Sequence, residues 1–554
     1  MTKPEETRET PSTAAAPETA AARLRAHGLL LLSAVLMFLG FTGFGLWPLG
    51  FVAMWPALFV LDPTETRGGL LREAGPRPGR TFFFRALFFG TVAYAGGFYW
   101  IEHTLRLFSG FPIVLTSAFA SIFWAFQGLQ FTAMLFVVRA ARKNGWPFAL
   151  ALPAAYLATE HAFPMLFEHY YGSTLISVPV MIQVAELGGP ELATLAIFLP
   201  SGALYDAVLA WSRGERLPRT GLAVAGAYLC FVVGFGLLRT AELEARMEAA
   251  PRLAVGVVQP NLGLFDRFED PRESLRAELA ATQALEREAA PDLIVWPESS
   301  VSFWLDDARN LRGRLLRGVH TPVLFGGIRH GERNERGERR EHNTAFLADA
   351  DGDVIGTYDK TYLLAFGEYL PFGETFPVLY DISEHSGRFS PGSHVHPLEL
   401  PLSPHPERGE RPDAIRIAAL ICYEDIVSSF VRRAVNEGDP HVLINMTVDT
   451  WFGDTQEPHV HLSLAAFRAV EHRRFLVRAT NSGISAIVDA LGRFNARTPV
   501  FEATTLAGEV RLLSGHTTLF EQLGHWPGGL AILLSALVVL RRPEQLRARR
   551  RATA

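Results

Sequence analysis

The sequence has little cysteine, a small net charge and no apolar segment at its very start. Cys230 and Cys422 are its two cysteines, and they lie too far apart to indicate a disulfide framework or a cysteine zinc site. The net charge of -5 is small, and no basic patch is interleaved with aromatic residues, which argues against nucleic-acid binding. The first residues lack a charged segment followed by an apolar one, so we expect no cleavable signal peptide.

The length of the chain and the composition of its first residues indicate several domains. With 554 residues the chain is too long for one ordinary hydrophobic core, so we expect at least two domains. Residues 1–24 are rich in Pro, Thr, Ala and Glu and show no apolar periodicity. Such a segment buries too little apolar surface to fold, and we expect a disordered N-terminal tail at 1–24.

Long apolar runs dominate two parts of the chain. Seven runs follow one another within 25–240, and an eighth occupies 522–541. Each run is close to the ~20 residues that a helix needs to cross a bilayer. A single run is compatible with a buried helix of a soluble protein, but soluble domains rarely supply so many. The runs therefore predict an α-helical polytopic membrane domain with eight spans.

Basic residues alternate between the loops of this membrane domain. Lys and Arg are frequent before the first span, after the second, fourth and sixth spans, and in the tail at 542–554. The other loops have almost none. Because cytoplasmic loops carry the excess of Lys and Arg, we expect both termini in the cytoplasm. The region at 250–510 follows an odd number of spans, so we expect it on the opposite side.

A few polar side chains fall within the apolar runs. Glu160, His161 and Asp206 are ionisable, and ionisable residues at membrane depth often have a function. They are also compatible with positions near the membrane interface or with bonds between helices, and both alternatives stay open. Cys230 lies in the seventh run, where we expect it to serve packing.

The region at 250–510 has a different pattern. Short segments rich in Val and Ile end in polar residues, and the pair Asp351-Gly352 is typical of a hairpin turn. Helices are predicted at 271–288 and 458–475 from the spacing of their apolar residues. His459, His461 and His472 on the second helix lack acidic or thiol partners at ligand spacing, so we expect surface or hydrogen-bonding histidines. Strands mixed with helices and hairpins predict a layered α/β or α+β domain.

Three of the predicted strands end in residues that can carry out nucleophilic catalysis. Glu298 ends "LIVWPES", Lys360 ends "VIGTYDK" and Cys422 ends "IAALICYED". Strands that terminate together bring their end residues into one cleft, a common place for active sites. A glutamate base and a lysine would supply what the Cys422 thiol needs as a nucleophile. The alternative is that Cys422 is a small buried hydrophobe, as most free cysteines are.

The residues around these three positions carry a specific resemblance. "WPES", "YDKTYLLAFGEYLPF" and "ICYED" are similar to the three signature blocks of the nitrilase superfamily, whose members use a Glu-Lys-Cys triad. With seven spans before this domain and one after it, the chain resembles the apolipoprotein N-acyltransferases, membrane members of that superfamily. The stretch from Asn445 to Asp489 is also similar to the segment that follows the nucleophile in that family.

The resemblance implies an αββα sandwich in the periplasm and a two-step acyl transfer in a bacterial inner membrane. Cys422, deprotonated by Glu298, would take an acyl chain from a phospholipid as a thioester. Lys360 and the backbone N–H of Tyr423 would hold the oxyanion. The acyl chain would then pass to the N-terminal amine of diacylglyceryl-cysteine in a lipoprotein. The phospholipid donor, the diacylated apolipoprotein and the bilayer would be the partners, and no metal or other cofactor is implied.

The resemblance also assigns supporting residues. Glu368 matches a glutamate that positions the lysine and the reactants, Glu424 matches a supporting acid, and Asn343 matches an asparagine near the site. Phe268 stands close to where the family often has a tryptophan, and it is expected to contact an acyl chain. Trp451, in the segment after the nucleophile, is expected to bind substrate as well.

The segment after Lys360 is apolar but interrupted by glycine and proline. It carries Leu363, Leu364, Phe366, Tyr369, Leu370, Phe372 and Phe376. A buried core loop is one interpretation. The other is a lid that dips toward the bilayer and admits lipid tails, because exposed apolar patches often mark such contacts.

Two other functions are compatible with parts of this pattern. A membrane-tethered nitrilase-like amidase would use the same triad to hydrolyse a small amide, but one membrane anchor would suffice for it. A transporter or receptor with a soluble binding module would need polar residues deep in several spans, and there are few. It would also tolerate Cys422→Ala, which an acyltransferase would not.

Overall fold

The computed structural model describes most of the chain. It covers residues 19–62, 78–263, 269–305, 310–333 and 339–541, except positions 374, 377, 379, 381–386, 403, 405–407 and 409. The tail expected at 1–24 lies outside these residues as far as position 18, and the first helix begins at Ala20, inside the expected tail. The basic tail expected at 542–554 also lies outside them.

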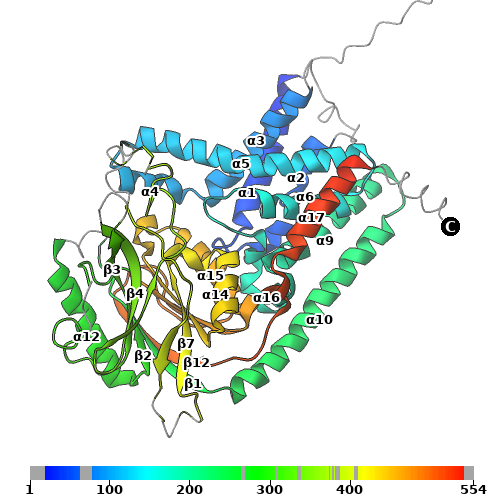
Figure 1. The fold of residues 1–554 in the computed structure, drawn as a ribbon. Helices are drawn as coiled ribbons and strands as arrows, with labels where there is room; N and C mark the ends of the chain where they lie inside the picture. The colour runs from blue at the N-terminus through cyan, green and yellow to red at the C-terminus, as the bar shows by residue number, and fades with distance from the viewer. Residues whose placement is uncertain are drawn as a thin grey trace, which may run out of the picture.

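The helical part of the molecule consists of apolar helices from both ends of the chain (Figure 1). Its elements are α1 (Ala20–Leu39), η1 (Trp47–Phe51), α2 (Trp55–Leu61), α3 (Pro78–Gly97), α4 (Trp100–Ser109), α5 (Ile113–Lys143), α6 (Phe148–Ala162), η2 (Tyr171–Ser177), α7 (Pro179–Ile182), α8 (Ala185–Gly188), α9 (Pro190–Arg213), α10 (Arg219–Ala249), α16 (Leu519–Leu523) and α17 (Trp526–Leu540). Although α17 lies near the C-terminus, it packs beside α6 and α5, which completes this part of the fold.

Each of the eight predicted apolar runs is largely helical, but not every helix is long enough to span a bilayer. Four helices, α1, α5, α9 and α10, are long and apolar enough, and α3 with α4 adds a fifth if that bent pair counts as one span. The helical segments at 47–61, 148–162 and 526–540 have only 15 residues each. At 1.5 Å per residue, such a helix covers about 22 Å of a core that is about 30 Å thick. Length and composition therefore support several membrane helices and do not establish eight spans.

The α/β domain contains two sheets of six strands each. The first has the order β12-β1-β2-β3-β4-β5, and the second has the order β11-β10-β9-β8-β7-β6. The strands are β1 (Arg252–Gln259), β2 (Leu293–Val295), β3 (Val323–Arg333), β4 (Arg339–Ala348), β5 (Val354–Asp359), β6 (Leu398–Pro401), β7 (Ala414–Ile421), β8 (Val442–Thr447), β9 (Phe475–Thr480), β10 (Ala486–Val488), β11 (Phe494–Arg497) and β12 (Thr504–Arg511). The predicted hairpin is confirmed, because β4 and β5 pair antiparallel and Gly352 takes a φ of +80° in the turn between them.

The two sheets pack face to face with helices on their outer sides, as an αββα sandwich. Alternate residues of β1 and β2, such as Val257 and Val295, face a core that they share with Ile417 and Ile444 of the second sheet. The opposite face of the first sheet packs against α12 (Pro271–Ala289). Helices α14 (Ser428–Gly438) and α15 (Glu457–His472) lie between the second sheet and the helical part (Figure 1).

Two predicted boundaries change in the structure. Helix α15 ends at His472, because Arg473 adopts a left-handed φ of +51°, and β9 begins at Phe475. The predicted helix at 458–475 is therefore three residues too long at its C-terminal end. The Val- and Ile-containing segment at 483–494 is typical of a single strand, but the structure forms the pair β10 and β11 there, with Gly492 at a φ of +78° in the turn. Strands β6, β9 and β12 and helix α14 were not predicted from the sequence.

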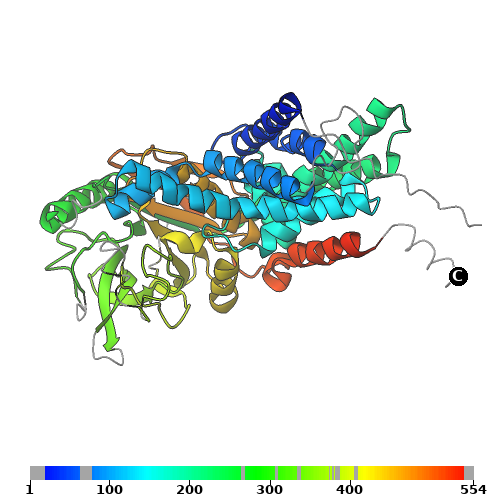
Figure 2. The ribbon, with the colours of Figure 1, turned by 90° about the horizontal axis from the view of Figure 1, so that it is seen from above.

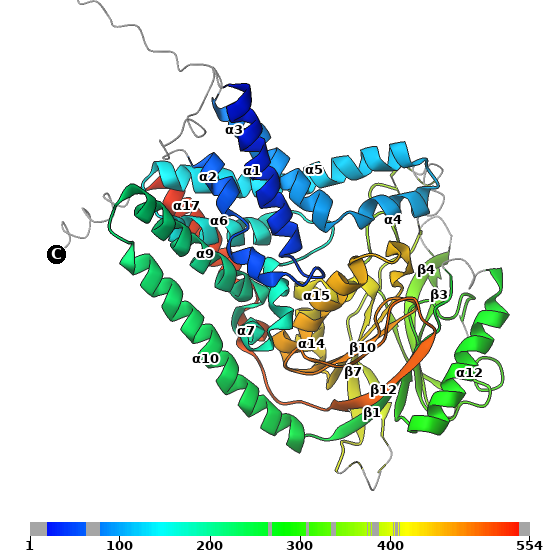
Figure 3. The same ribbon diagram turned by 180° about the vertical axis from the view of Figure 1, so that it is seen from behind.

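Buried polar contacts join the helical part to the α/β domain. Arg473, which is 1% exposed, donates from Nε to Oε2 of Glu186 at 2.5 Å and from Nη1 to Oε1 of Gln183 at 2.6 Å. Gln183 donates in turn to the carbonyl oxygen of Leu491 at 3.0 Å. Helix α10 leads along the side of the molecule into β1, with β12 beside it (Figure 3). Seen from above, α4 and the first part of α5 reach over the α/β domain (Figure 2).

Candidate active site

The first candidate residue, Glu298, follows the short buried strand β2. The indole of Trp296 donates to the hydroxyl of Thr282 on α12 at 2.9 Å, which anchors this turn to the outer helix. Gly326 of β3 lies so close that a Cβ there would meet Glu298 Cα at 2.6 Å, so glycine permits this approach. Glu298 is 7% exposed, and its Oε1 accepts a hydrogen bond of 2.7 Å from Asn343 Nδ2.

The second candidate residue, Lys360, lies directly after β5 and is 1% exposed. Its Nζ lies 2.8 Å from Oε2 of Glu368 and 3.7 Å from Oε1 of Glu298. Its backbone N–H donates to the carbonyl oxygen of Asn343 at 2.8 Å. The Nδ2 of Asn343 also reaches Oε1 of Glu368 at 3.0 Å, so this one asparagine connects both carboxylates.

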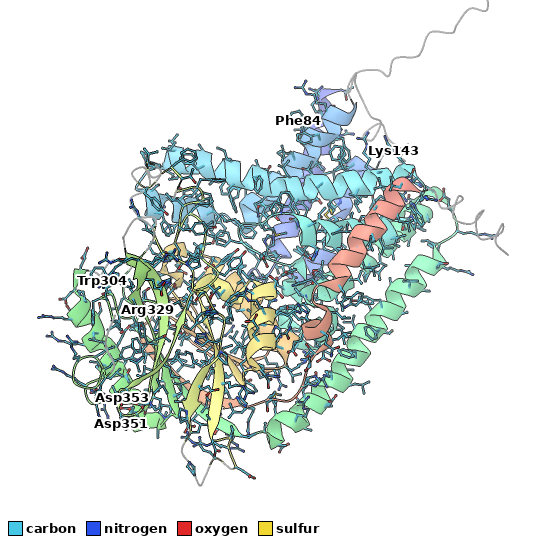
Figure 4. All side chains as sticks on the ribbon, in the orientation of Figure 1. Phe84, Lys143, Trp304, Arg329, Asp351 and Asp353 are labelled. Atoms are coloured by element: carbon cyan, nitrogen blue, oxygen red, sulfur yellow. The ribbon has the colours of Figure 1, made fainter. Side chains whose placement is uncertain are left out.

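The preceding residue, Asp359, holds the end of β5 in place. It receives hydrogen bonds of 2.7 Å from Nε of Arg329 and from the hydroxyl of Thr344. Figure 4 labels Arg329 on the β3 side of the first sheet. Burial opposes ionisation of Asp359, but Arg329 and Thr344 outweigh it and lower the pKa of this carboxyl. The strand that presents Lys360 is thus anchored by a charged pair next to the site.

The third candidate residue, Cys422, occupies a strained turn at the end of β7. Its φ is +50°, a left-handed conformation that a residue with a Cβ adopts only when its surroundings impose it. Asn445 of β8 donates from Nδ2 to the Cys422 carbonyl oxygen at 3.1 Å. The hydroxyl of Thr447, at the end of β8, donates to Oδ1 of Asp449 at 3.2 Å and lowers the pKa of the thiol. The parallel neighbours β7 and β8 therefore set the position of the thiol together.

Glu424 connects the turn at Cys422 to the segment after Lys360. Its Oε2 accepts from the N–H of Ile421 at 2.8 Å. Its Oε1 accepts from the Tyr358 hydroxyl and from the N–H groups of Thr361 and Tyr362, at 2.7, 2.8 and 2.9 Å. Burial raises the pKa of Glu424 to about 7, against the opposing effects of Lys360 and the backbone N–H groups. The side chain is fully buried and acts as a brace between the two sheets.

The charges around Cys422 keep its sulfur protonated at rest. Burial and the carboxylate of Glu298 raise the pKa of the thiol well above its usual value, while Lys360 and Thr447 lower it. Burial alone would lower the pKa of Lys360, but Glu368 and Glu298 outweigh this and raise it. The resting site therefore holds a neutral thiol beside a charged ammonium, and the thiol needs a base at the moment of attack.

An apolar cavity adjoins Cys422. Its walls come from the α/β domain and from the helical part, and they include Phe98, Trp100, Phe167, Leu364, Tyr423 and Phe452. The cavity volume is about 30 Å³, room for about two water molecules. Tyr423 links the two parts directly, because its hydroxyl donates to the carbonyl oxygen of Leu166 at 2.5 Å. An acyl chain can enter only if part of the wall moves.

Two aromatic residues, Phe268 and Trp451, were predicted to contact substrate. Phe268 lies outside the described residues, so its role stays a prediction. Trp451 stacks on Phe108 of α4 with ring centroids 4.2 Å apart, and its carbonyl oxygen accepts a bond from Thr104. Its neighbour Phe452 lines the cavity instead. Trp451 therefore joins the α/β domain to α4, and a direct contact with substrate stays a prediction.

The segment after Lys360 is not a buried core loop. Phe366, Phe372 and Phe376 are 58%, 75% and 57% exposed, and Tyr362 is 41% exposed. Phe366 and Phe372 both have left-handed φ angles, of 69° and 64°. Leu364, by contrast, faces the Cys422 cavity. One segment thus has side chains both in the cavity wall and on an exposed apolar surface.

A buried polar network behind Cys422 was missed in the sequence. Arg478, in the middle of β9, donates to Asp425 at 2.6 Å, to Asn445 at 2.8 Å and to Asp449 at 3.0 Å. His461 completes the network, with Nε2 at 2.8 Å from Asp425. The expectation that the histidines of this helix form hydrogen bonds is confirmed for His461. The sequence contained a signal for this network: Asn445 and Arg478 lie within apolar strand segments, where a buried polar side chain needs hydrogen-bond partners.

The polar residues of the apolar runs make bonds between helices. Glu160 accepts a hydrogen bond of 2.7 Å from the N–H of Tyr171, and Asp206 accepts one of 2.8 Å from the N–H of Ala149 at the start of α6. His161 lies 3.5 Å from Glu191. Cys230 is exposed on α10, so the expectation that it packs between helices is wrong. Its position leaves Cys422 as the cysteine at the site.

Two family models match the chain. The model described as Carbon-nitrogen hydrolase matches residues 254–515, and the model described as Apolipoprotein N-acyltransferase N-terminal domain matches residues 33–203. Among solved structures, a similarity to Nit3 of Saccharomyces cerevisiae, a nitrilase superfamily member, has a TM-score of 0.35 at 16% identity, over 47% of this chain and 90% of that one. The αββα fold and the two family models define a carbon-nitrogen hydrolase domain attached to apolar helices.

Curated relatives extend over most of the chain. The apolipoprotein N-acyltransferase of Azotobacter vinelandii is 31% identical over 533 residues, or 93% of this chain and 95% of the relative. Those of Rhizobium meliloti and Geobacter metallireducens are 30% and 29% identical, over 81% and 89% of this chain and 83% and 91% of their own lengths. The chain belongs to the apolipoprotein N-acyltransferase family.

Proposed function

We propose that this protein transfers a fatty acyl chain from a phospholipid to the N-terminal amine of diacylglyceryl-cysteine in a lipoprotein, through a thioester on Cys422. Its family membership makes it an acyltransferase of lipoprotein biosynthesis. One observation carries the residue assignment: Glu298, Lys360 and Cys422, which lie far apart in the sequence, interact electrostatically, and Cys422 lines the apolar cavity.

In the first step, the sulfur of Cys422 attacks the ester carbonyl carbon of the phospholipid. Glu298 accepts the thiol proton as the S–C bond forms, which avoids a free thiolate next to two carboxylates. The carbonyl oxygen takes up the negative charge, near the Lys360 ammonium and the N–H of Tyr423. The C–O bond then breaks, and Glu298 returns the proton to the departing alkoxide of the lysophospholipid. The acyl chain remains on the sulfur as a thioester.

In the second step, the lipoprotein amine attacks the thioester carbonyl. Glu298 removes a proton from the amine, and the same oxyanion contacts stabilise the second tetrahedral intermediate. The C–S bond breaks, and the sulfur regains its proton as an amide forms on the lipoprotein. Two bulky lipids can use one site in turn, because the lysophospholipid leaves before the acceptor binds.

The composition of the cavity wall favours acyl transfer over hydrolysis of a small amide. A small polar amide needs polar groups in its site, whereas the residues around Cys422 are largely aromatic and aliphatic. Several of them come from the helical part, which a tethered amidase would not require. The exposed aromatic residues of the segment after Lys360 fit a lid that contacts the bilayer and opens to admit lipid tails.

We further propose eight spans, with the α/β domain in the periplasm and both termini in the cytoplasm. Lys143 at the end of α5 lies on the side of the helical part away from the α/β domain, and Phe84 of α3 is exposed nearby (Figure 4). Basic loops on that side support a cytoplasmic location for it. The short segments would span by local bilayer thinning or by packing against longer neighbours. Labelling of single cysteines introduced into these loops in intact cells tests the orientation.

The experiment that tests the transfer is intact-protein mass spectrometry of the purified full-length chain after incubation with phospholipid vesicles. We expect one added acyl mass that hydroxylamine removes, and its transfer to a diacylated lipopeptide added afterwards. Cys422→Ala should gain no mass, while Cys230→Ser, the matched control, should behave like the parent protein. Release of fatty acid into water without transfer to the amine would instead support the hydrolase.

A further inference from the structure

Three side chains with metal-binding groups meet at one end of the helical part, away from Cys422. His161 lies in the last turn of α6, Glu191 in the first turn of α9, and His525 directly before α17. Nδ1 of His525 lies 2.7 Å and Nδ1 of His161 3.5 Å from Oε1 of Glu191. One ligand atom from each of the three residues lies within 4.8 Å of the others. Two imidazoles and a carboxylate are a common ligand set for Zn²⁺.

The geometry fits a tetrahedral ion with small adjustments. Bonds of about 2.0–2.2 Å to nitrogen and oxygen place neighbouring ligands roughly 3.3 Å apart in such a site. The pair His161–Glu191, at 3.5 Å, is close to this separation, and His525, at 2.7 Å, would move outward by about 0.6 Å. Glu191 is fully buried, and its Oε2 has no hydrogen-bond partner in the part of the chain that the structure describes. That oxygen is a second, unused donor for a cation.

Two glycines make room for these ligands. A Cβ at Gly528 would lie 2.4 Å from Cγ of His161. A Cβ at Gly189 would lie 2.7 Å from Oε2 of Glu191, and Gly189 also has a φ of +77°. Larger residues at either position would therefore push a ligand out of place. The imidazole of His161 is 34% exposed, which leaves a path by which an ion can enter.

The surrounding charges favour a cation at this place. Glu168 interacts electrostatically with His161, Glu191 and His525, and also with Arg468. Arg468, the nearby cation, is engaged with Glu471 at 2.5 Å and with the carbonyl oxygen of Ile426. In the other histidine–carboxylate cluster of the described residues, Asp449, Glu457 and His461, Arg478 already pairs with Asp449. In that second cluster, the guanidinium of Arg478 already supplies the positive charge.

We propose that His161, Glu191 and His525 bind one Zn²⁺ ion, with water as the fourth ligand. The ion would join α6, α9 and α17. Two of its ligands, Glu191 and His525, are 334 residues apart in the sequence. It would also fix the segment between His161 and Tyr170. This segment supplies Phe167 and His169 to the wall of the Cys422 cavity, and its Leu166 accepts the Tyr423 hydroxyl. The ion has a structural role and takes no part in acyl transfer.

Metal binding is tested on the full-length protein without any assay of activity. After stripping with a chelator, reloading with ZnCl₂ and gel filtration, we expect one zinc per chain by elemental mass spectrometry. His161→Ala and His525→Ala should weaken binding by more than the roughly 10–100-fold that loss of an outer-shell partner costs. His459→Ala, which removes an exposed histidine outside the cluster, should bind like the parent. Affinity should fall below about pH 6.5, where imidazole takes up a proton.

Two measurements keep the proposal testable if a variant folds poorly. Co²⁺ added to the stripped parent protein should give the visible absorption of a tetrahedral histidine site, and its absence would overturn the proposal. The proposal would also be overturned if the parent protein took up no more zinc than the double variant H161A/H525A. In a Cys230→Ser background, chelation should also speed alkylation of Cys422, because the cavity wall loosens. An unchanged rate would refute the link between the ion and the wall.

Discussion

The ammonium of Lys360 lies 2.8 Å from Oε2 of Glu368, nearer than the 3.7 Å that separates it from Oε1 of Glu298. Glu368 is therefore the main anchor of the lysine. Glu298 keeps a looser contact with Lys360 and is held mainly by Asn343, at 2.7 Å. Because Lys360 interacts more closely with Glu368, it stabilises the ionised form of Glu298 less strongly, and Glu298 can accept a proton more easily.

Substitution Glu368→Gln should slow thioester formation without abolishing it. The amide loses the negative charge that holds Lys360, so the ammonium no longer points at the developing oxyanion. We expect a fall of roughly 10²-fold, the size of effect seen when one electrostatic contact of an oxyanion is lost. Single-turnover acylation of Cys422, followed by mass spectrometry, measures it. The control is Glu399→Gln, an exposed glutamate on β6, and an equal loss there would contradict the assignment.

Substitution Glu298→Gln should make Cys422 easier to ionise and yet inactive. The carboxylate raises the pKa of the thiol, so its removal moves the pH profile of Cys422 alkylation to lower pH. Lys360→Met removes a group that lowers this pKa and should move the profile to higher pH. Acyl transfer should fall by at least ~10² in both variants, because the base or the oxyanion contact is missing. The profiles are measured with iodoacetamide in a Cys230→Ser background, and shifts of the same sign would refute this electrostatic account.

Glu424 should make the stability of the protein depend on pH. Its pKa of about 7 in the folded state lies above the ordinary value of ~4.3, so the folded state binds the extra proton between these values. Its contribution to stability is complete below pH ~4.3 and is lost as the pH rises through 7, by at most ~1.4 kcal/mol per pH unit.

Glu424→Gln should remove this dependence and lower stability at every pH. Both oxygens of Glu424 accept hydrogen bonds, so the NH₂ group of a glutamine at this position would face a donor instead of an acceptor. Thermal unfolding in detergent between pH 5 and pH 7.5 compares the two proteins. A parent protein whose midpoint rises with pH relative to the variant would show that the sign is wrong.

Phe372→Ser should weaken the use of phospholipid in vesicles while leaving the chemistry of Cys422 intact. The ring is 75% exposed, and inserting it into a bilayer would contribute roughly 2 kcal/mol, or about 30-fold in apparent affinity. We expect a higher KM for vesicles and an unchanged kcat. Ile355→Ser, at an exposed position on β5, is the matched control. A fall in kcat with an unchanged KM would argue against a lid that contacts the membrane.

Much of the local structure follows from local patterns. The Val-rich run of Leu253–Val258 predicts β1, and the pair Asp351-Gly352 predicts the turn between β4 and β5. Helix α12 begins at the predicted residue and ends one residue beyond the predicted end, because its apolar residues recur at helical spacing. In the structure, the side chain of Asp270 caps its first turn. Strand β9 was missed, because Arg478 interrupts its apolar pattern and the partners that satisfy the arginine come from other strands.

The number of spans shows the limit of apolar composition as a guide. The run that contains α17 is as apolar as any other, yet the helix ends after 15 residues. Hydropathy reports how favourably a segment partitions into lipid, but the length of a helix depends on its caps and on what packs beside it. Asn144 and Trp146 bind backbone carbonyls at the end of α17, contacts made by residues about 395 positions away.

The sequence alone was enough to single out Glu298, Lys360 and Cys422 as candidates, because they lie in short motifs at strand ends, and such motifs are local. It also determined that the chain belongs partly in a membrane, because apolar runs are properties of contiguous segments. The packing of the chain brings Asn343 between two carboxylates, places Asn445 and Glu424 at the strained turn of Cys422, and lines the cavity with residues of the helical part. These contacts join residues distant along the chain, and their distances are set by how strands and helices pack rather than by any spacing in the sequence.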